Sequence, residues 1–248
     1  MNVFIYDSFL NQKKYDRLLA RLETRITDLG LNGKISRLSL IRNVAETVES
    51  ELKRGAKTIV AVGNNQLVNQ IVNSLAGQLV PLGIIPVGQT NNDLANGLGI
   101  ASAEDACDIL SARLLARLDL GLAGQTYFLG QAAIGNQGTV IDMNKDYTIE
   151  TKNQGMIYVF NLANAAVKLP TKVKLRPDDG LLELVVSAQA SGFLKQRLDN
   201  SIFKITKITI ANPKAQLLLD GSIALDTPAE ITVAPKCLNV IVGKNRNF

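Results

Sequence analysis

Two short apolar runs constrain the fold more than any other feature of the sequence. Thr58–Val62 reads TIVAV and Leu82–Ile85 reads LGII, and each run stops at a loop that contains glycine. Continuous runs of this length, without polar alternation, are typical of parallel strands buried on both faces. Between them, Leu67–Leu75 repeats apolar residues at helical spacing. This alternation predicts an α/β fold with an open, mostly parallel sheet flanked by helices.

The rest of the first half extends the alternation. Further strands are expected at Val3–Tyr6 and Ile35–Leu38, and helices are expected to end at Gly30 and Gly55. A capping pattern at Ser102-x-x-Asp105 predicts one more helix, running to about Leu115.

The second half changes character near residues 116–118. Strand-like runs such as MIYVFN, LLELVV and FKITKITI follow one another with turn residues between them. One helix-like segment is expected near Ser191–Leu198. We therefore predict an α/β domain over 1–117 and an antiparallel β-rich domain over 118–248. Whether the tail after Val242 returns to the first domain stays open.

Composition excludes several kinds of site. The sequence has no histidine, which rules out Ser-His-Asp and Cys-His nucleophiles and His-ligated zinc. Its two cysteines, Cys107 and Cys237, lie far apart and suggest no disulfide framework. The N-terminus does not resemble a signal peptide, and no run of about 18 apolar residues appears. A cytoplasmic protein is expected, with any membrane contact peripheral.

The net charge of +5 allows two interpretations. It is either a solvated basic surface or a surface for an anionic partner, such as a nucleotide or acidic membrane lipid. Basic residues are not interleaved with aromatic residues, so no nucleic-acid partner is expected. Strand edges in the β-rich half allow a homodimer.

Two loops after the buried strands are candidate phosphate-binding loops. In open α/β sheets, ligands bind beyond the carboxyl ends of the strands, where backbone N–H groups and a helix N-terminus can hold phosphate. Each loop taken alone is also an ordinary strand-to-helix turn. The candidate nucleotide-binding residues are Gly63, Asn64, Asn65, Gln66, Gly88, Gln89, Thr90, Asn91, Asn92 and Asp93.

The two loops together resemble those of the diacylglycerol-kinase-like lipid kinases. VAVGNNQLVNQIVNSL (Val60–Leu75) is similar to the family segment VVVGGDGTLNEVVNGL, and LGIIPVGQTNNDLANGLGI (Leu82–Ile100) is similar to LGIIPLGTGNDFARALGI. DDGLLELVV (Asp178–Val186) resembles DDGLLEVVV. The segment from Leu217 to Val242 resembles the closing segment around Asp-Gly-Glu. The matches follow the family order across nearly the whole chain.

The resemblance implies that 1–117 is a nucleotide-binding-like domain and that 118–248 is sandwich-like, the two-domain architecture that NAD kinases share. It also implies transfer of the ATP γ-phosphoryl group to a lipid hydroxyl, with Mg²⁺. The sequence departs from this pattern where the chemistry needs negative charge. Asn65, Gln137 and Ser222 stand at acidic positions, and Ser222 replaces the expected general base. In the glycine-rich loop, Asn64 and Gln66 replace glycines.

Several acidic residues persist, each with two interpretations. Asp93 is either a ligand-binding residue or a helix N-cap. Asp178 and Asp179 are candidate metal ligands, or they form a turn with Gly180. Asp220 is the candidate catalytic residue, or part of a hairpin turn with Gly221.

Three functions follow from these patterns. The first is a diverged lipid-kinase relative with weak or lost activity and residual nucleotide binding. The second is an active kinase with a rearranged site that uses ATP and Mg²⁺. The third is a binding or assembly module without enzymatic activity, whose ligand the sequence does not identify.

Overall fold

The computed structural model describes residues 1–39, 43–88, 92–143, 147–162, 174–190, 197–246 and 248. The chain divides into two compact units. The first contains residues 1–118 and the returning segment 237–246, and the second contains the described residues between 119 and 236. Each unit is described by itself.

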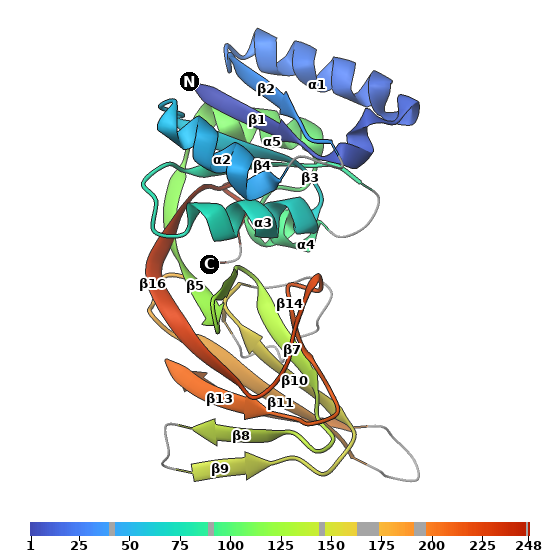
Figure 1. The fold of residues 1–248 in the computed structure, drawn as a ribbon, viewed down its shortest axis with the longest axis vertical. Coiled ribbons are helices and arrows are strands. Elements are labelled where there is room, and N and C mark those ends of the chain that lie inside the picture. The colour runs from blue at the N-terminus through green and yellow to red at the C-terminus, as the bar shows by residue number, and fades with distance from the viewer. Residues whose placement is uncertain (40–42, 89–91, 144–146, 163–173, 191–196, 247) are drawn as a thin grey trace. The chain divides into compact units, whose positions relative to one another are not determined.

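The first unit is built on a parallel sheet (Figure 1). Its strands lie in the order β2-β1-β3-β4, and the end of β16 pairs with β4 at Val240 and Leu82. All residues of β3 and β4 are buried, as expected for strands covered on both faces. The bounds are β1 Asn2–Tyr6, β2 Gly33–Arg37, β3 Thr58–Gly63, β4 Leu82–Pro86 and β16 Ala229–Ile241. The predicted parallel sheet is confirmed.

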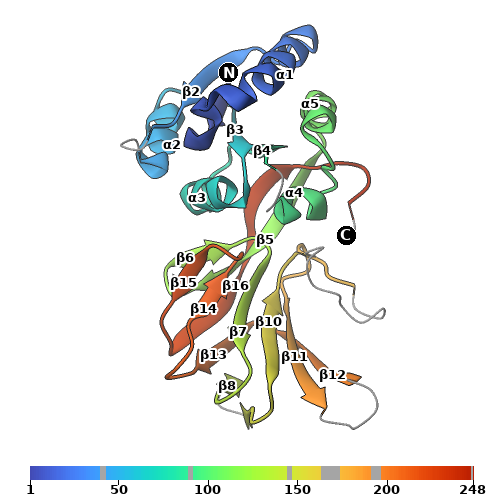
Figure 2. The same cartoon turned by 90° about the vertical axis from the view of Figure 1, so that its right-hand side faces the viewer.

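Helices cover both faces of this sheet. Figure 2 shows α2 (Val44–Lys53) and α3 (Asn65–Leu75) on one face, with α1 (Asp16–Asp28) and α5 (Ala103–Ala112) on the other. Short 3₁₀ turns, η1 (Ser8–Asn11) and η2 (Lys13–Tyr15), precede α1, and α4 (Asp93–Gly97) follows β4.

The helix predicted from Ser102 is shorter than expected. The hydroxyl of Ser102 accepts from the backbone N–H of Asp105 at 3.0 Å, which confirms the cap. The helix ends at Ala112 because Arg113 turns into the left-handed region, with φ of 52°. Leu115, expected in the helix, begins strand β5 (Leu115–Ala123) instead.

The second unit is antiparallel and β-rich, as predicted. One sheet has the order β12-β11-β10-β7-β14-β15, and strands of the other follow the order β16-β13-β8-β9, with β5 pairing β16 and β6. Alternate residues of the two sheets enclose one apolar core, which includes Phe128, Ile157 and Leu184. The remaining bounds are β6 Thr126–Phe128, β7 Gln131–Gly135, β8 Val140–Met143, β9 Tyr147–Glu150, β10 Gly155–Phe160, β11 Leu182–Ala190, β12 Arg197–Ile205, β13 Lys207–Ala211, β14 Leu217–Leu219 and β15 Ile223–Leu225.

The helix expected near Ser191–Leu198 is not supported by the described part of the segment. Residues 191–196 lie outside the described residues, and Arg197 begins strand β12. None of the described helices combines the length and the apolar character that crossing a bilayer requires.

Gly121 provides a test of the core of the second unit. It pairs with Phe128 across β5 and β6, and a Cβ at position 121 would overlap the fully buried Phe128 ring. Gly121→Ala is therefore expected to lower the free energy of unfolding by roughly 1–3 kcal/mol through overpacking, measured by urea denaturation.

Gly135→Ala is the matched control, because a Cβ there meets no atom within 4 Å. It should change the free energy of unfolding by less than about 0.5 kcal/mol. Equal effects of the two substitutions would contradict the proposed overlap.

Candidate functional site

The loop after β3 begins at a glycine that its neighbours require. A Cβ on Gly63 would lie 2.9 Å from Cβ of Asp7 and 3.2 Å from its Oδ2. Asp7 is held there because it continues β1, and its N–H donates to the carbonyl of Val62 at 3.0 Å. Burial raises the pKa of the Asp7 carboxyl group above its usual value. The resemblance did not single out Asp7. The signal available was its place as the first polar residue after a buried strand.

Asn64 caps α3 with its own side chain. Its Oδ1 accepts from the backbone N–H of Gln66 at 3.0 Å and of Leu67 at 3.3 Å. The backbone of Asn64 is extended, with φ of −97°, so the residue does not use the left-handed conformation open to asparagine. A glycine at this position would leave both N–H groups open to a ligand. Here the side chain occupies the position where a phosphate oxygen would accept.

Asn65 joins the two candidate loops. It is nearly buried, and its Oδ1 accepts from the backbone N–H of Leu94, in α4, at 3.4 Å. Gln66, which stands in place of a glycine, has an exposed side chain. Leu67 is buried, and its Cδ2 would lie 3.1 Å from a Cβ on Gly63. An amide and an apolar side chain therefore stand where the family has a carboxylate and a hydroxyl.

The second loop is described only in part, because Gln89, Thr90 and Asn91 lie outside the described residues. Gly88 has φ of +127°, a conformation open only to glycine. Its carbonyl accepts from Nδ2 of Asn92 at 3.1 Å. Asn92, not Asp93, is the N-cap residue of α4, and Asp93 is the first residue of that short helix.

The described residues of these loops do not fit a magnesium–triphosphate group. Asn64 occupies the donors at the start of α3, and the described residues contain no cluster of three or more acidic, cysteine or histidine side chains able to hold a metal. Asp7 is the carboxylate beside Gly63. No step of phosphoryl transfer is therefore derived through ATP or Mg²⁺.

In the second unit, Asp220 lies in a turn and accepts backbone hydrogen bonds, and its catalytic role stays a prediction. It starts the turn between β14 and β15 with φ of 46°. Its fully buried carboxylate accepts from the backbone N–H groups of Leu129 (2.9 Å), Gly130 (2.8 Å) and Gln131 (2.7 Å). Burial raises the pKa of Asp220 to about 6, although these three hydrogen bonds act to lower it. Ser222, at the position of the expected base, is exposed.

Asp178 and Asp179 lie in a turn and are paired with cations. Arg176 contacts Asp178 at 3.2 Å, and Lys204 contacts Asp179 at 3.3 Å. The turn is tied to Asp119, whose Oδ2 accepts from the N–H of Gly180 at 2.7 Å. The geometry is that of a turn, and the metal-binding role of the two aspartates stays a prediction.

Glu183 is the most unusual acidic group in the second unit. Its side chain is buried, and neither carboxyl oxygen has a hydrogen-bond partner. It stands across the sheet from Phe160 and from Lys204. Burial, reinforced by the charge of Asp179 and opposed by Lys204, raises the pKa of Glu183 to about 7. Sequence patterns did not identify Glu183, because a charged residue between apolar ones is the ordinary alternation of a strand with one solvated face.

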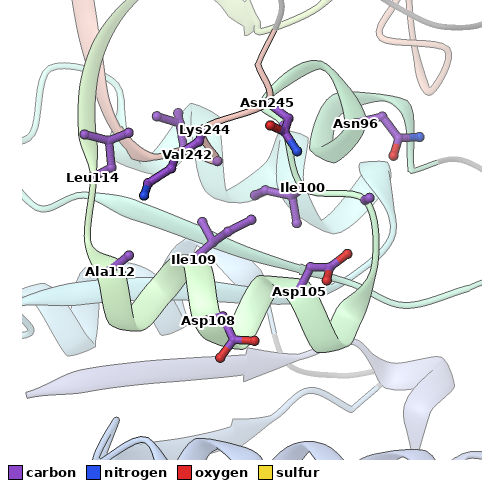
Figure 3. Close-up of a pocket in the computed structure, with 13 residues that line it drawn as sticks. Asn96, Ile100, Asp105, Asp108, Ile109, Ala112, Leu114, Val242, Lys244 and Asn245 are labelled. Carbon is purple, nitrogen blue, oxygen red and sulfur yellow. The ribbon is translucent and has the colours of Figure 1, made fainter.

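A cavity of about 450 Å³ lies in the first unit, away from the residues singled out in the sequence. Figure 3 shows Ile109 of α5 pointing up toward the returning segment that carries Val242 and Lys244, while Asp108 points away below the helix. Asp108 pairs with Arg25 at 2.5 Å. The lining combines apolar side chains such as Ile100 and Ile109 with the polar residues Asp105 and Lys244.

The raised pKa of Glu183 predicts that the free energy of unfolding depends on pH. Folding raises its pKa from about 4.5 to about 7, so the folded state favours the protonated form and loses relative stability as the pH rises through about 7. Glu183→Gln removes this loss. The stability of the variant relative to the parent chain should be greater at pH 8 than at pH 5 by on the order of 1–3 kcal/mol, measured by urea denaturation at each pH.

Asp220 titrates in both proteins, so the difference between them isolates Glu183. A difference in unfolding free energy that is the same at pH 5 and pH 8 would contradict a raised pKa at Glu183.

Comparison with known proteins finds similarity to diacylglycerol kinases. Residues 2–123 match the family Diacylglycerol kinase catalytic domain. A diacylglycerol kinase of Staphylococcus haemolyticus is 36% identical over 94 residues, which are 36% of this chain and 28% of that protein. The chain spans 62%, 28% and 57% of the length of three curated relatives that it matches.

Solved structures share the fold over the whole described architecture. A diacylglycerol kinase from Bacillus anthracis superposes with a TM-score of 0.79 at 18% identity, covering 99% of this chain and 97% of that one. An NAD kinase from Archaeoglobus fulgidus, solved in complex with ATP, has a TM-score of 0.62 at 13% identity, covering 100% and 96%. The predicted fold class is confirmed. The chain therefore has the fold of these diacylglycerol and NAD kinases, and its residues 2–123 resemble the diacylglycerol kinase catalytic domain.

Proposed function

We propose that this chain is a diverged lipid-kinase relative that binds nucleotide weakly and transfers phosphoryl groups slowly or not at all. The observation that carries the proposal is the cap on α3. Asn64 Oδ1 accepts from two backbone N–H groups that would otherwise face a phosphate. A triphosphate would have to displace this side chain, and it would lose the free energy of the cap, about 1 kcal/mol.

The second unit supports the same proposal. A general base needs an oxygen that is free to accept the proton of the substrate hydroxyl. The carboxylate of Asp220 accepts three backbone N–H groups and is fully buried. The neighbouring Ser222 brings no basic group.

Asn64→Gly tests the proposal, because it removes the side chain that accepts from the first backbone N–H groups of α3. Calorimetric titration with ATP and ADP, with and without Mg²⁺, should give dissociation constants weaker than roughly 1 mM for the parent chain. The variant should bind ATP up to about fivefold more tightly, since the cap is worth about 1 kcal/mol and about 1.4 kcal/mol corresponds to a factor of ten. Its stability should fall by only a few tenths of a kcal/mol.

Asn43→Gly is the matched control. Asn43 caps α2 in the same way, accepting from the N–H of Ala45 at 2.8 Å, and is absent from both candidate loops. It should leave nucleotide affinity unchanged. Micromolar binding of Mg-ATP by the parent chain would overturn the proposal.

The carboxylate of Asp7 beside Gly63 favours a second candidate, an active kinase with a rearranged site. In that case Asp7 supplies the negative charge that Asn65 lacks. Mg-ATP-dependent phosphorylation of a short-chain diacylglycerol, abolished in Asp7→Asn, would establish this candidate in place of the first. Lipid as the acceptor, contact with acidic membrane and homodimer formation stay predictions from the sequence.

A further inference from the structure

A polar groove of about 310 Å³ lies between β2 and α2 in the first unit. This volume falls in the range of small-ligand sites. None of its lining residues belongs to the two candidate loops. They include Lys34 and Arg37 of β2, Glu46, Ser50 and Glu51 of α2, and Arg54, which follows α2.

Glu51 forms ion pairs with two cations of the groove. Its side chain is only 4% exposed, and its Oε1 contacts both Nζ of Lys34 at 2.5 Å and Nη1 of Arg54 at 3.0 Å. The two cations come from different elements and would repel each other without this carboxylate. They share one negative charge, so together the three groups carry a net positive charge. The ammonium and guanidinium groups keep further N–H donors beyond those directed at Glu51.

The other oxygen of Glu51 lacks a donor. Oε2 is buried and has no hydrogen-bond partner. An unpaired buried carboxylate oxygen costs about 1–3 kcal/mol or more, so a bound donor at this position would be favoured. The Arg54 side chain is 62% exposed, so it is free to turn toward a bound anion, and binding at Oε2 requires that this movement expose the oxygen.

We propose that this groove binds a small phosphorylated polyol. Arg54 and Lys34 bind the phosphate, with the planar guanidinium suited to two parallel hydrogen bonds to phosphate oxygens. A hydroxyl group of the same ligand donates to Oε2 of Glu51. Glu46, the second carboxylate of the lining, limits the charge of the ligand to one phosphate group.

The test is calorimetric titration of the full chain with glycerol 3-phosphate, inorganic phosphate and glycerol. We expect glycerol 3-phosphate to bind at least about tenfold more tightly than inorganic phosphate, because only the ester also supplies the hydroxyl donor. Arg54→Ala should weaken that binding at least tenfold. Glu51→Gln should remove the preference for the ester over inorganic phosphate.

Lys53→Ala is the matched control for charge. Lys53 is the neighbour of Arg54, is exposed, pairs with Glu49 at 2.6 Å and does not line the groove. It should leave affinity unchanged, and Arg54→Ala should fold normally because that side chain is also largely exposed. Absence of binding, equal affinity for phosphate and its ester, or equal weakening by the two substitutions would overturn the proposal. Binding that shifts no amide resonances of residues 34–37 and 50–54 in NMR spectra would also overturn it.

Discussion

The hydrogen bonds from Gln66 and Leu67 to the side chain of Asn64 decide what the loop after β3 is able to do. A helix N-terminus has N–H groups that need acceptors, and either a ligand or a side chain supplies them. In this protein the side chain of Asn64 supplies an acceptor for two of these N–H groups. This caps the helix and leaves fewer N–H donors for phosphate. Asn65 continues the same pattern by accepting from the N–H of Leu94. The loops are held together by amide groups of the chain itself.

In the second unit, carboxylate side chains are the acceptors of backbone N–H groups. Asp220 accepts three N–H groups of the segment 129–131, and Asp119 accepts from Gly180 and Lys236 at 2.7 Å each. Such charge-assisted bonds are strong and orient the segments that they join. The oxygens of these carboxylates thereby serve as acceptors for backbone N–H groups. A kinase fold is thus compatible with acidic residues that persist for structural reasons.

The sequence predicts the fold better than the site. TIVAV and LGII identified the buried parallel strands, because a continuous apolar run indicates that both faces of a strand are buried. The prediction that α5 extends beyond Ala112 was wrong, since a left-handed residue such as Arg113 carries no clear local signal in the sequence. At the site, the replacements at Asn64 and Asn65 were visible, but their partners were not, because those bonds depend on loop geometry. Asp7 and Glu183 were missed because their importance arises from burial and from neighbours distant in sequence.

The most direct measurement is the response of the Gln66 and Leu67 backbone amides to Mg-ATP in NMR spectra of the parent chain. These two N–H groups are the ones that Asn64 occupies. If the cap persists, their chemical shifts stay unchanged up to millimolar nucleotide. Large, saturating shifts of both amides would show phosphate replacing the Asn64 side chain, and would contradict the proposed loss of the phosphate site.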